Sequence, residues 1–488
     1  MRKPFSNQPR LDSRGVLGVQ LNLECRDEIV PILRALQHIY SQPETRDAIL
    51  DLIAEDVNQD SRDDVGREGM DYWQILVLAA VRLGCNLDYD KLQDLAEQHR
   101  NLRHIMGIGD WRDATDFGWR RIRDNVCLLK PATIEKISQL LVAEGHRLQP
   151  DAAKQTRADS FVVETNIHWP SESTLIRDGV RKILELCVLI ASTLKVSGWR
   201  QSDHLLKQVK RLSRHIERIS SRKGPRYEER LQVEYRKLLK LSGKITRKAS
   251  RLLQEAETNR AMAGSAMVEQ LRVFLERTEQ VRDTACRRVL KGETVPNDEK
   301  LFSMFEPHTQ LYKRGKAGEP VQFGRLVLVF EDAAGFITHS YVLGRHEHDR
   351  DVVVEQTRIV QERLHGAIEQ ASFDRGFHTP ENQERLAAIV ASVCLPKPGA
   401  KQSAEQSRKA TLVFRQARDR HAGVESAIGA LQAGNGLERS RDCTELGFER
   451  YVMLGILGRN LHVLGKLVIA NEASSSEAAR SQRQASAA

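Results

Sequence analysis

The stretch "SFDRGFHTPENQ", residues 372–383, places a carboxylate where a strand-like run gives way to the start of a helix. Asp374 closes the run, and Thr379 followed by Pro380 has the residue types of a helix cap and a first helical position. Between them we expect Gly376 to take a positive φ in a tight turn. Because ligands of open α/β sheets gather at the carboxyl ends of strands, Asp374 is either a turn former or a ligand-binding residue at a sheet edge.

Strand and helix signals continue on both sides of this stretch. The segment "ADSFVVETNI", residues 158–167, has the β-branched and aromatic composition of a strand, and "EDAAG" separates two strands of a predicted hairpin. The hairpin strands are expected at 325–330 and 336–343, a short further strand at "ATLVF", residues 410–414, and helices at 175–194, 349–364, 380–392, 417–432 and 447–470. Strands interleaved with helices indicate an α/β core.

The region before this core is helical in its periodicity, from residue 20 to residue 145. Two of its segments, 71–85 and 88–107, begin with Asp at a cap position and end at or beside a glycine. Two helices joined by a short link form either a DNA-reading helix-turn-helix or part of an ordinary helical bundle, and the sequence leaves both open.

Length and composition point to a soluble protein of several domains. The 488 residues suffice for two to four domains, and 5% aromatic with 29% charged residues favours a helix-rich protein. The seven cysteines are scattered without a C-x-x-C pair, which argues against disulfides or zinc and favours a reducing cytosol. The first fifteen residues lack the apolar segment of a secretory signal, and the longest apolar run, 183–194, is too short to span a bilayer. We therefore expect a cytoplasmic protein with no membrane segment.

Residues 195–253 concentrate the positive charge. They hold 18 Lys and Arg against five acidic residues, a net charge of +13, whereas the whole chain carries +9 and the remainder therefore −4. Leu and Ile recur at helical spacing on both sides of a "KGP" break at 223–225, which predicts a basic helical hairpin. The hairpin is either a solvated coiled coil or a phosphate-binding insertion. We favour the second because charge this concentrated is costly to hold together without a polyanion.

These patterns divide the chain into six parts, with the α/β core interrupted after its first strand. We predict a flexible N-terminus at 1–19, a helical DNA-binding or dimerisation domain at 20–150, the first part of the core at 151–194, the basic helical insertion at 195–300, the rest of the core at 301–470 and a disordered tail at 471–488.

Three carboxylates are candidates for a shared metal site. Asp159 lies in the first core strand, Asp374 ends a later strand, and Glu425 sits in a helix whose apolar stripe is formed by Val424, Ile428 and Leu431. Their hard oxygen ligands suit Mg²⁺ or Mn²⁺, and two such ions would support phosphodiester chemistry. The alternative is that Asp159 is a polar strand-edge residue, Asp374 a turn former and Glu425 a surface charge.

Three blocks of this sequence resemble bacterial insertion-sequence transposases of the DDE type, in the ISNCY-like group with a long helical insertion after the first catalytic strand. "DSFVVETNIHWPSESTLIRDGVR", residues 159–181, is similar to the block of the first catalytic Asp, and "FDRGFHTPENQERL", residues 373–386, to that of the second. "RHAGVESAIGALQAGNGLERSRDCTELGFERYVMLGILGRNL", residues 420–461, is similar to the block of the catalytic Glu. Residues 60–145 resemble the group's helical N-terminal domain more loosely.

The resemblance implies an RNase H-like mixed sheet with Asp159, Asp374 and Glu425 as a catalytic triad that binds two Mg²⁺ or Mn²⁺ ions. It implies a transposase that cleaves double-stranded DNA at the terminal inverted repeats of its own mobile element and joins the ends to target DNA. Partners would be that DNA and further copies of the chain, in a homodimer or higher oligomer on the bacterial nucleoid. This sequence has Glu172 where the group commonly has Asp, and no Tyr or Lys role can be carried over around Glu425.

Basic residues near the triad and in the insertion are our candidates for DNA contacts. Arg418 and His421 precede Glu425 by seven and four residues, on its side of the helix. The full set of candidates is Arg375, Arg418, His421, Lys207, Lys210, Arg211, Arg214, Lys244, Arg247 and Lys248. The alternative function is a non-catalytic DNA-binding protein derived from a transposase. A helical scaffold protein, with 195–253 as an oligomerising coiled coil, is a further rival.

Overall fold

The computed structural model describes residues 2–5, 14–58, 69–109, 115–259, 262, 264–313, 321–397 and 412–487. The chain forms two compact units, unit 1 with Met1–Asn166 and Arg325–Ala488, and unit 2 with Ile167–Gly324. We had expected the insertion to span 195–300. The unit boundaries fall at 167 and 324, because the helix after the first strand packs with the inserted helices and not on the sheet.

The N-terminal part of unit 1 is helical, as the sequence predicts. Its elements are η1 (Val16–Gly18), α1 (Ile29–Tyr40), α2 (Pro43–Val57), α3 (Tyr72–Gly84), α4 (Tyr89–Gln98), α5 (Arg100–Ile105), α6 (Trp119–Val126), α7 (Pro131–Leu148) and η2 (Pro150–Lys154). The N-terminus does not begin as a loose segment, since Tyr72 and Trp73 donate backbone hydrogen bonds to Lys3 and Pro4.

The pair of helices considered as a helix-turn-helix is built differently from the prediction. Asp71 caps α3 in a capping box with Gln74, but the segment 88–107 splits into α4 and α5 because the His99 ring accepts a hydrogen bond from the Leu102 backbone. Every residue of α3 is buried, and α4 carries three acidic residues against one lysine. Neither α3 nor α4 offers DNA a basic face, whereas the short α5 carries Arg100, Arg103 and His104, so both alternatives stay open.

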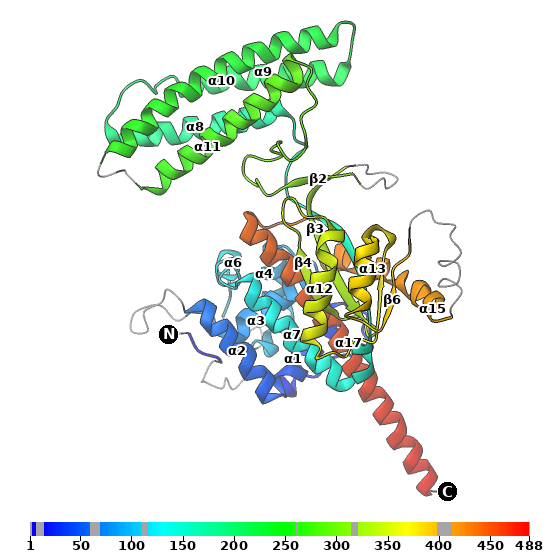
Figure 1. The fold of residues 1–488 in the computed structure, drawn as a ribbon. Coiled ribbons are helices and arrows are strands. Elements are labelled where there is room, and N and C mark those ends of the chain that lie inside the picture. The colour runs from blue at the N-terminus through cyan, green and yellow to red at the C-terminus, as the bar shows by residue number, and fades with distance from the viewer. Residues whose placement is uncertain are drawn as a thin grey trace. The chain divides into compact units, whose positions relative to one another are not determined.

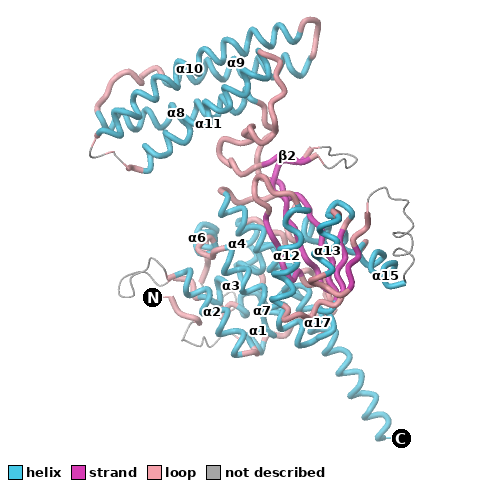
Figure 2. The backbone as a smooth tube through the Cα atoms, viewed as in Figure 1, coloured by secondary structure: helices cyan, strands magenta, loops and turns pink. Residues whose placement is uncertain are grey.

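A six-stranded mixed sheet forms the centre of the α/β region (Figure 2). Its strands are β1 (Gln155–Glu164), β2 (Gln310–Tyr312), β3 (Gln322–Asp332), β4 (Ile337–Val342), β5 (Gln370–Phe373) and β6 (Ser392–Cys394). The order is β2-β3-β1-β5-β6, with β4 also paired to β3. β3 runs antiparallel to β2 and β4, whereas β5 runs parallel to both β1 and β6.

The short strand expected at 410–414 was placed wrongly. Residues 410 and 411 lie outside the described residues, and Leu412 begins the helix α15. The third parallel strand is β6 instead, which follows α13 (Pro380–Ala387) where we had expected the end of a longer helix. β5, α13 and β6 thus form a parallel crossover. The sequence signal for β6 is weak because this strand has three residues.

Helices cover both faces of the sheet. α12 (Asp349–Arg363) and α13 lie on one face, where Ser160 donates a 2.8 Å hydrogen bond to Asp349 at the start of α12 (Figure 1). On the other face Phe161 and Val163 join the main hydrophobic core with residues of α1, α3, α7 and α17 (Glu445–Ala487). The remaining helical elements of unit 1 are α15 (Leu412–His421), α16 (Gly423–Gly429) and η5 (Ala430–Gly434), so the single helix expected at 417–432 is broken at Ala422.

α17 is the core helix of unit 1 and packs on α1, α3 and α7. Among the described helices it alone has the length and apolarity to cross a bilayer, over Glu445–Ser475, but 72% of that window is buried inside the fold. Asn460 ties it to the sheet by accepting from the Ile337 backbone N–H at 2.8 Å and donating to the Ile337 carbonyl at 2.9 Å. The helix runs to Ala487, so the tail expected to be disordered continues it.

Unit 2 is a helical unit with its own core. It contains α8 (Glu172–Leu194), α9 (Ser202–Arg222), α10 (Tyr227–Thr258), α11 (Ala266–Ala285), η3 (Cys286–Leu290) and β2. The predicted basic hairpin is α9 and α10. Lys223 and Arg226 take φ values of 39° and 52° in the turn between them.

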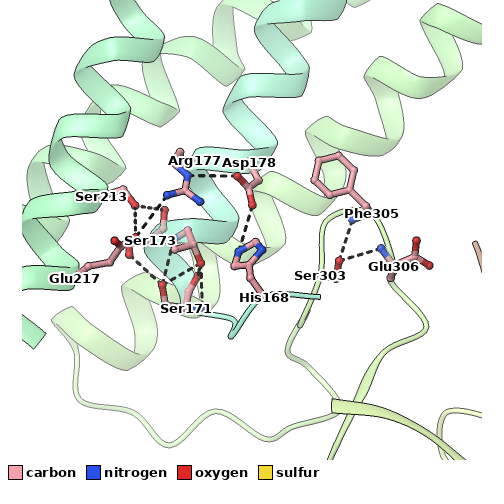
Figure 3. A network of polar contacts seen from close by, with 11 residues as sticks. His168, Ser171, Ser173, Arg177, Asp178, Ser213, Glu217, Ser303, Phe305 and Glu306 are labelled. Carbon is pink, nitrogen blue, oxygen red and sulfur yellow. Dashed lines mark hydrogen bonds and ion pairs between the residues drawn. The ribbon is translucent and has the colours of Figure 1, made fainter. Parts of the chain in front are cut away.

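A polar network fixes the start of α8 against α9 (Figure 3). Arg177 lies 3.3 Å from Asp178 and 3.6 Å from Glu217 of α9, and Ser213 of α9 donates to the Ser173 carbonyl at 3.2 Å. His168 lies 3.5 Å from the same Asp178. These contacts orient α9, which carries six Lys and Arg residues.

Candidate functional site

Asp159 and Asp374 follow paired residues of two neighbouring parallel strands, Asp159 in the middle of β1 and Asp374 directly after the last residue of β5. β1 and β5 pair in parallel with Ala158 opposite Phe373, so the next residue on each strand is an aspartate. Because Ala158 and Phe373 are paired neighbours in the sheet, the aspartates that follow them start from adjacent backbone positions. Asp159 is half-buried and Asp374 is exposed.

The turn after β5 holds Asp374 largely as predicted. Thr379 caps α13 by accepting from the Asn382 backbone at 3.0 Å, and Pro380 occupies the first helical position. The expectation for Gly376 was wrong, because Arg375–Phe377 form a short 3-10 helix and Gly376 does not take a positive φ. A 3-10 turn needs no left-handed residue, and this one buries the side chain of Phe377.

Helices α15 and α16 lie on the face of the sheet that carries both aspartates. Side chains alternate along a strand, so Arg157 shares a face with Asp159, and Ser372 shares one with Asp374. The Arg157 guanidinium donates to the Arg420 carbonyl at 2.8 Å, and the Ser372 hydroxyl lies 3.2 Å from Nδ1 of His421. The end of α15 is therefore attached to β1 and β5 directly beside the two aspartates.

Glu425 projects from the exposed side of α16. Val424, Ile428 and Leu431 are buried as the sequence predicts, and they hold the helix and the following turn against the core. The charges of Asp374 and Glu425 both act on the pKa of His421, so both carboxylates lie near that ring. A strand end and a helix far apart in sequence thus meet at one histidine.

His421 is kept neutral by its surroundings. Burial lowers the pKa of His421 below its ordinary value, and Arg157 acts in the same direction, although Asp374 and Glu425 oppose both. A neutral imidazole can hydrogen-bond Ser372 with one nitrogen and leave the other for a ligand or a proton. His421 is therefore better suited to accept or share a proton than to serve as a fixed positive charge.

Arg157 and Glu331 form a buried ion pair beneath the site, which sequence reasoning missed. Arg157 Nε lies 2.5 Å from Glu331 Oε2, and Arg459 lies 3.9 Å from the other oxygen of this carboxylate, which is 2% exposed. Burial raises the pKa of Glu331, and Arg157 partly offsets this effect. Gly423 permits the contact, because a Cβ there would overlap the Arg157 guanidinium.

The oxygen donors are present, but their side chains are not assembled into a closed cluster. Among the described residues no group of three or more His, Cys, Asp and Glu side chains is placed to hold a metal ion. One oxygen of Asp159 accepts a 2.7 Å hydrogen bond from the Ser160 backbone. The two aspartates and the glutamate offer hard oxygen donors, the ligand type that Mg²⁺ and Mn²⁺ prefer.

The basic candidates near the triad differ in the exposure and contacts of their side chains. Arg375 follows Asp374 directly and is exposed. Arg418 on α15 is also exposed, with its side chain 4.0 Å from Asp419. Of the three basic candidates near the triad, Arg375 and Arg418 are therefore exposed, and His421 is held by Ser372.

The seven basic candidates of unit 2 fall into two sets. Lys207, Lys210, Arg211 and Arg214 line one groove, which the structure extends with Arg218 and Lys237. Lys244, Arg247 and Lys248 lie outside it. Lys248 bonds the Gly198 carbonyl and stands 4.4 Å from the centre of the Trp199 ring, and Arg247 donates to the Gly243 carbonyl at 3.0 Å, so these two serve the fold of unit 2.

No protein-family model, curated protein or solved structure matches this chain. The function is therefore inferred from the residues and their geometry.

Proposed function

We propose that this protein is a DDE transposase with an RNase H-like core. It binds the terminal inverted repeats of its own insertion sequence as double-stranded DNA and catalyses metal-dependent cleavage and strand transfer. The observation that carries the proposal is that Asp159 and Asp374 follow paired residues of the adjacent parallel strands β1 and β5, while the end of α15, which leads into the Glu425 helix, is attached to the same face.

The strand arrangement supports the RNase H-like part of the proposal. In such cores an antiparallel hairpin flanks three parallel strands, and the first strand is central. Here β3 and β4 form the hairpin, β1 is central, and β5 and β6 run parallel to it. The helical unit 2 leaves the chain directly after β1 and returns at β3, which agrees with a long insertion behind the first catalytic strand.

The roles of the chain's own residues follow from their positions. Asp159, Asp374 and Glu425 would hold two divalent ions, which supply an activated attacking oxygen and neutralise charge on the leaving oxygen. Arg375 and Arg418 contact phosphates on either side of the reacting bond, because both are exposed at the edge where the carboxylates lie. His421 would use its other ring nitrogen near the carboxylates, while Ser372 holds the ring through Nδ1.

The proposed reaction also defines the binding partners of the protein. Its partners are the ends of its element, target DNA and further copies of itself, since joining two DNA ends needs at least two active sites. It acts in the bacterial cytoplasm at the nucleoid.

A cleavage assay on the DNA that flanks the gene tests the proposal. Wild type should cut at a pair of inverted repeats with Mg²⁺ and not with EDTA, and Asp374→Ala should lower the cleavage rate by about a hundredfold or more. Glu381→Ala is the matched control, because this exposed carboxylate on α13 pairs only with its helix neighbour Arg385 at 3.2 Å. Cuts that persist in Asp374→Ala would show that the triad is wrong.

The second candidate function is a non-catalytic DNA-binding protein derived from a transposase. The side chains of the triad are not gathered into a metal-holding group among the described residues, which is the observation that favours it. DNA binding without cuts, by a well-folded wild type supplied with Mg²⁺ or Mn²⁺, would replace the transposase proposal with this one.

A further inference from the structure

One side of α9 presents a continuous stripe of positive charge. Lys207, Lys210, Arg211, Arg214 and Arg218 recur at three- and four-residue steps, so they share one face of the helix. The opposite face is apolar, with Val209, Ile216 and Ile219 buried in unit 2. The stripe is therefore held in place by the packing of the helix that bears it.

The stripe borders a groove shared with α10. The groove has a volume of about 620 Å³ and gains Lys237 from α10, so that six cations face one carboxylate, Glu234. Glu234 is already engaged, with Lys237 Nζ at 2.7 Å and His215 Nδ1 at 3.4 Å. Its negative charge is therefore paired with Lys237 and His215 and does not neutralise the basic residues of the stripe.

The stripe itself lacks counter-charges within the described part of unit 2. No ion pair is found there for Lys207, Lys210, Arg211, Arg214 or Arg218. Glu217, the acidic residue nearest to them on α9, is turned toward Arg177 of α8 at 3.6 Å (Figure 3). Cations collected in one groove without acidic partners repel one another, and an external anion relieves that repulsion.

We propose that the groove between α9 and α10 binds the phosphate backbone of duplex DNA. The stripe from Lys207 to Arg218 spans eleven helical steps, or about 16 Å, which corresponds to roughly five base-pair steps of duplex. A row of that length fits successive phosphates better than a single small anion. The inference takes DNA as the ligand from the proposed function, and it assigns the contact to this groove and not to Lys244, Arg247 and Lys248.

Binding of a short fluorescent duplex of arbitrary sequence tests this assignment in the full-length protein. EDTA is present, so that no cleavage is involved. The groove variant combines Lys207→Gln, Lys210→Gln and Arg214→Gln. The control variant combines Arg236→Gln, Lys240→Gln and Lys244→Gln, which removes the same charge from the same hairpin outside the groove.

The groove variant should bind the duplex about tenfold more weakly or worse. Its plot of log Kd against log salt concentration should flatten by about two to three, one for each lost phosphate contact. The control should keep both values within about twofold of wild type, because its charges do not line the groove. Circular dichroism and a thermal melt should show both variants folded, since all the replaced side chains lie at the surface or half-buried.

Two results would overturn the assignment. Equal losses in the groove and control variants would mean that net charge, and not the groove, binds DNA. Displacement of the duplex by inorganic phosphate at the same phosphate concentration would mean that the groove holds a single anion and no DNA backbone. Neither result depends on Asp374, so the groove and the proposed catalysis can fail separately.

Discussion

At the scale of single residues, Arg157 connects the two halves of the candidate site. It lies two residues before Asp159 on the same strand face, pairs with the buried Glu331 and holds the last turn of α15 through the Arg420 carbonyl. The guanidinium makes these contacts in two directions, which a lysine cannot reproduce. Arg157 is therefore a positioning residue that sets where Glu425 stands relative to Asp159.

Replacement of Arg157 should damage stability and catalysis together. Arg157→Ala leaves Glu331 without its nearest counter-charge, and we expect the free energy of unfolding to fall by about 2–4 kcal/mol. Cleavage should slow while the Kd for DNA stays near wild type, because the Arg157 guanidinium is engaged by Glu331 and the Arg420 carbonyl. Urea denaturation and single-turnover cleavage measure the two effects.

A second substitution separates the effect of the unpaired Glu331 charge from the effect of losing the contact to Arg420. In the Arg157→Ala background, Glu331→Gln removes the unpaired carboxylate and should restore part of the stability. Cleavage should stay slow, because the link to Arg420 is still absent. Full recovery of cleavage in the double variant would show that Arg157 serves stability alone.

The sequence predicts some of these residues better than others, for physical reasons. Thr379 and Pro380 are local signals, because capping depends on residues three positions apart, and both were placed correctly. Gly376 was misjudged because a 3-10 turn and a tight turn share the same residue types. The alternation of side chains along β1 could have shown that Arg157 shares a face with Asp159. Its partner Glu331 is 174 residues away, and no local pattern links the two residues.

At the scale of elements, α17 depends on glycines that let other backbones approach it. A Cβ at Gly458 would lie 2.6 Å from the Gly84 nitrogen of α3, and one at Gly465 would overlap the Pro31 carbonyl of α1. The two glycines are seven residues apart and so share a face of the helix. Gly458 is the first residue of "GRNL", residues 458–461, which closes the third transposase-like block, and its close approach to α3 explains the glycine. Asn460 of the same run is hydrogen-bonded to Ile337 of β4.

Gly465→Ala should destabilise unit 1 by about 1–3 kcal/mol or more, because the obstacle is backbone and cannot rotate away. Gly429→Ala is the control. That residue has helical dihedrals and no atom within 4 Å of an added Cβ, so alanine there should stabilise by about 0.5–1 kcal/mol. Urea midpoints of the two variants should move in opposite directions. A loss in both would point to a role for helix flexibility in place of close packing.

Element boundaries were predicted least well where tertiary contacts decide them. β6 has three residues and exists through its pairing with β5, so the sequence around it resembles a helix end. The break at Ala422 between α15 and α16 coincides with the Arg157 contact, which is invisible to helical periodicity. The capped helices α3 and α13 carry their own start signals and were located from the sequence, whereas α8 begins three residues before its predicted start, at a Ser171 cap that the prediction did not use.

At the scale of the whole molecule, two hydrophobic cores share no residue. The core of unit 1 draws on α1, α3, α7, α17 and the sheet, and the core of unit 2 on α8 to α11. Sequence reasoning found the insertion by its charge but assigned α8 to the catalytic core, because its apolar face does not reveal which partner buries it. Each unit has enough buried surface for its own cooperative transition.

Calorimetry should therefore resolve two unfolding transitions, and one core variant in each unit assigns them. Leu238→Ala in α10 and Leu454→Ala in α17 remove fully buried side chains, at a cost of about 2–5 kcal/mol each. For units of this size the affected transition should fall by about 4–20 °C while the other stays in place. If a single transition moved equally in both variants, the units would unfold as one. The groove on unit 2 would then be mechanically coupled to the carboxylates on unit 1, and variants in either would have to be interpreted together.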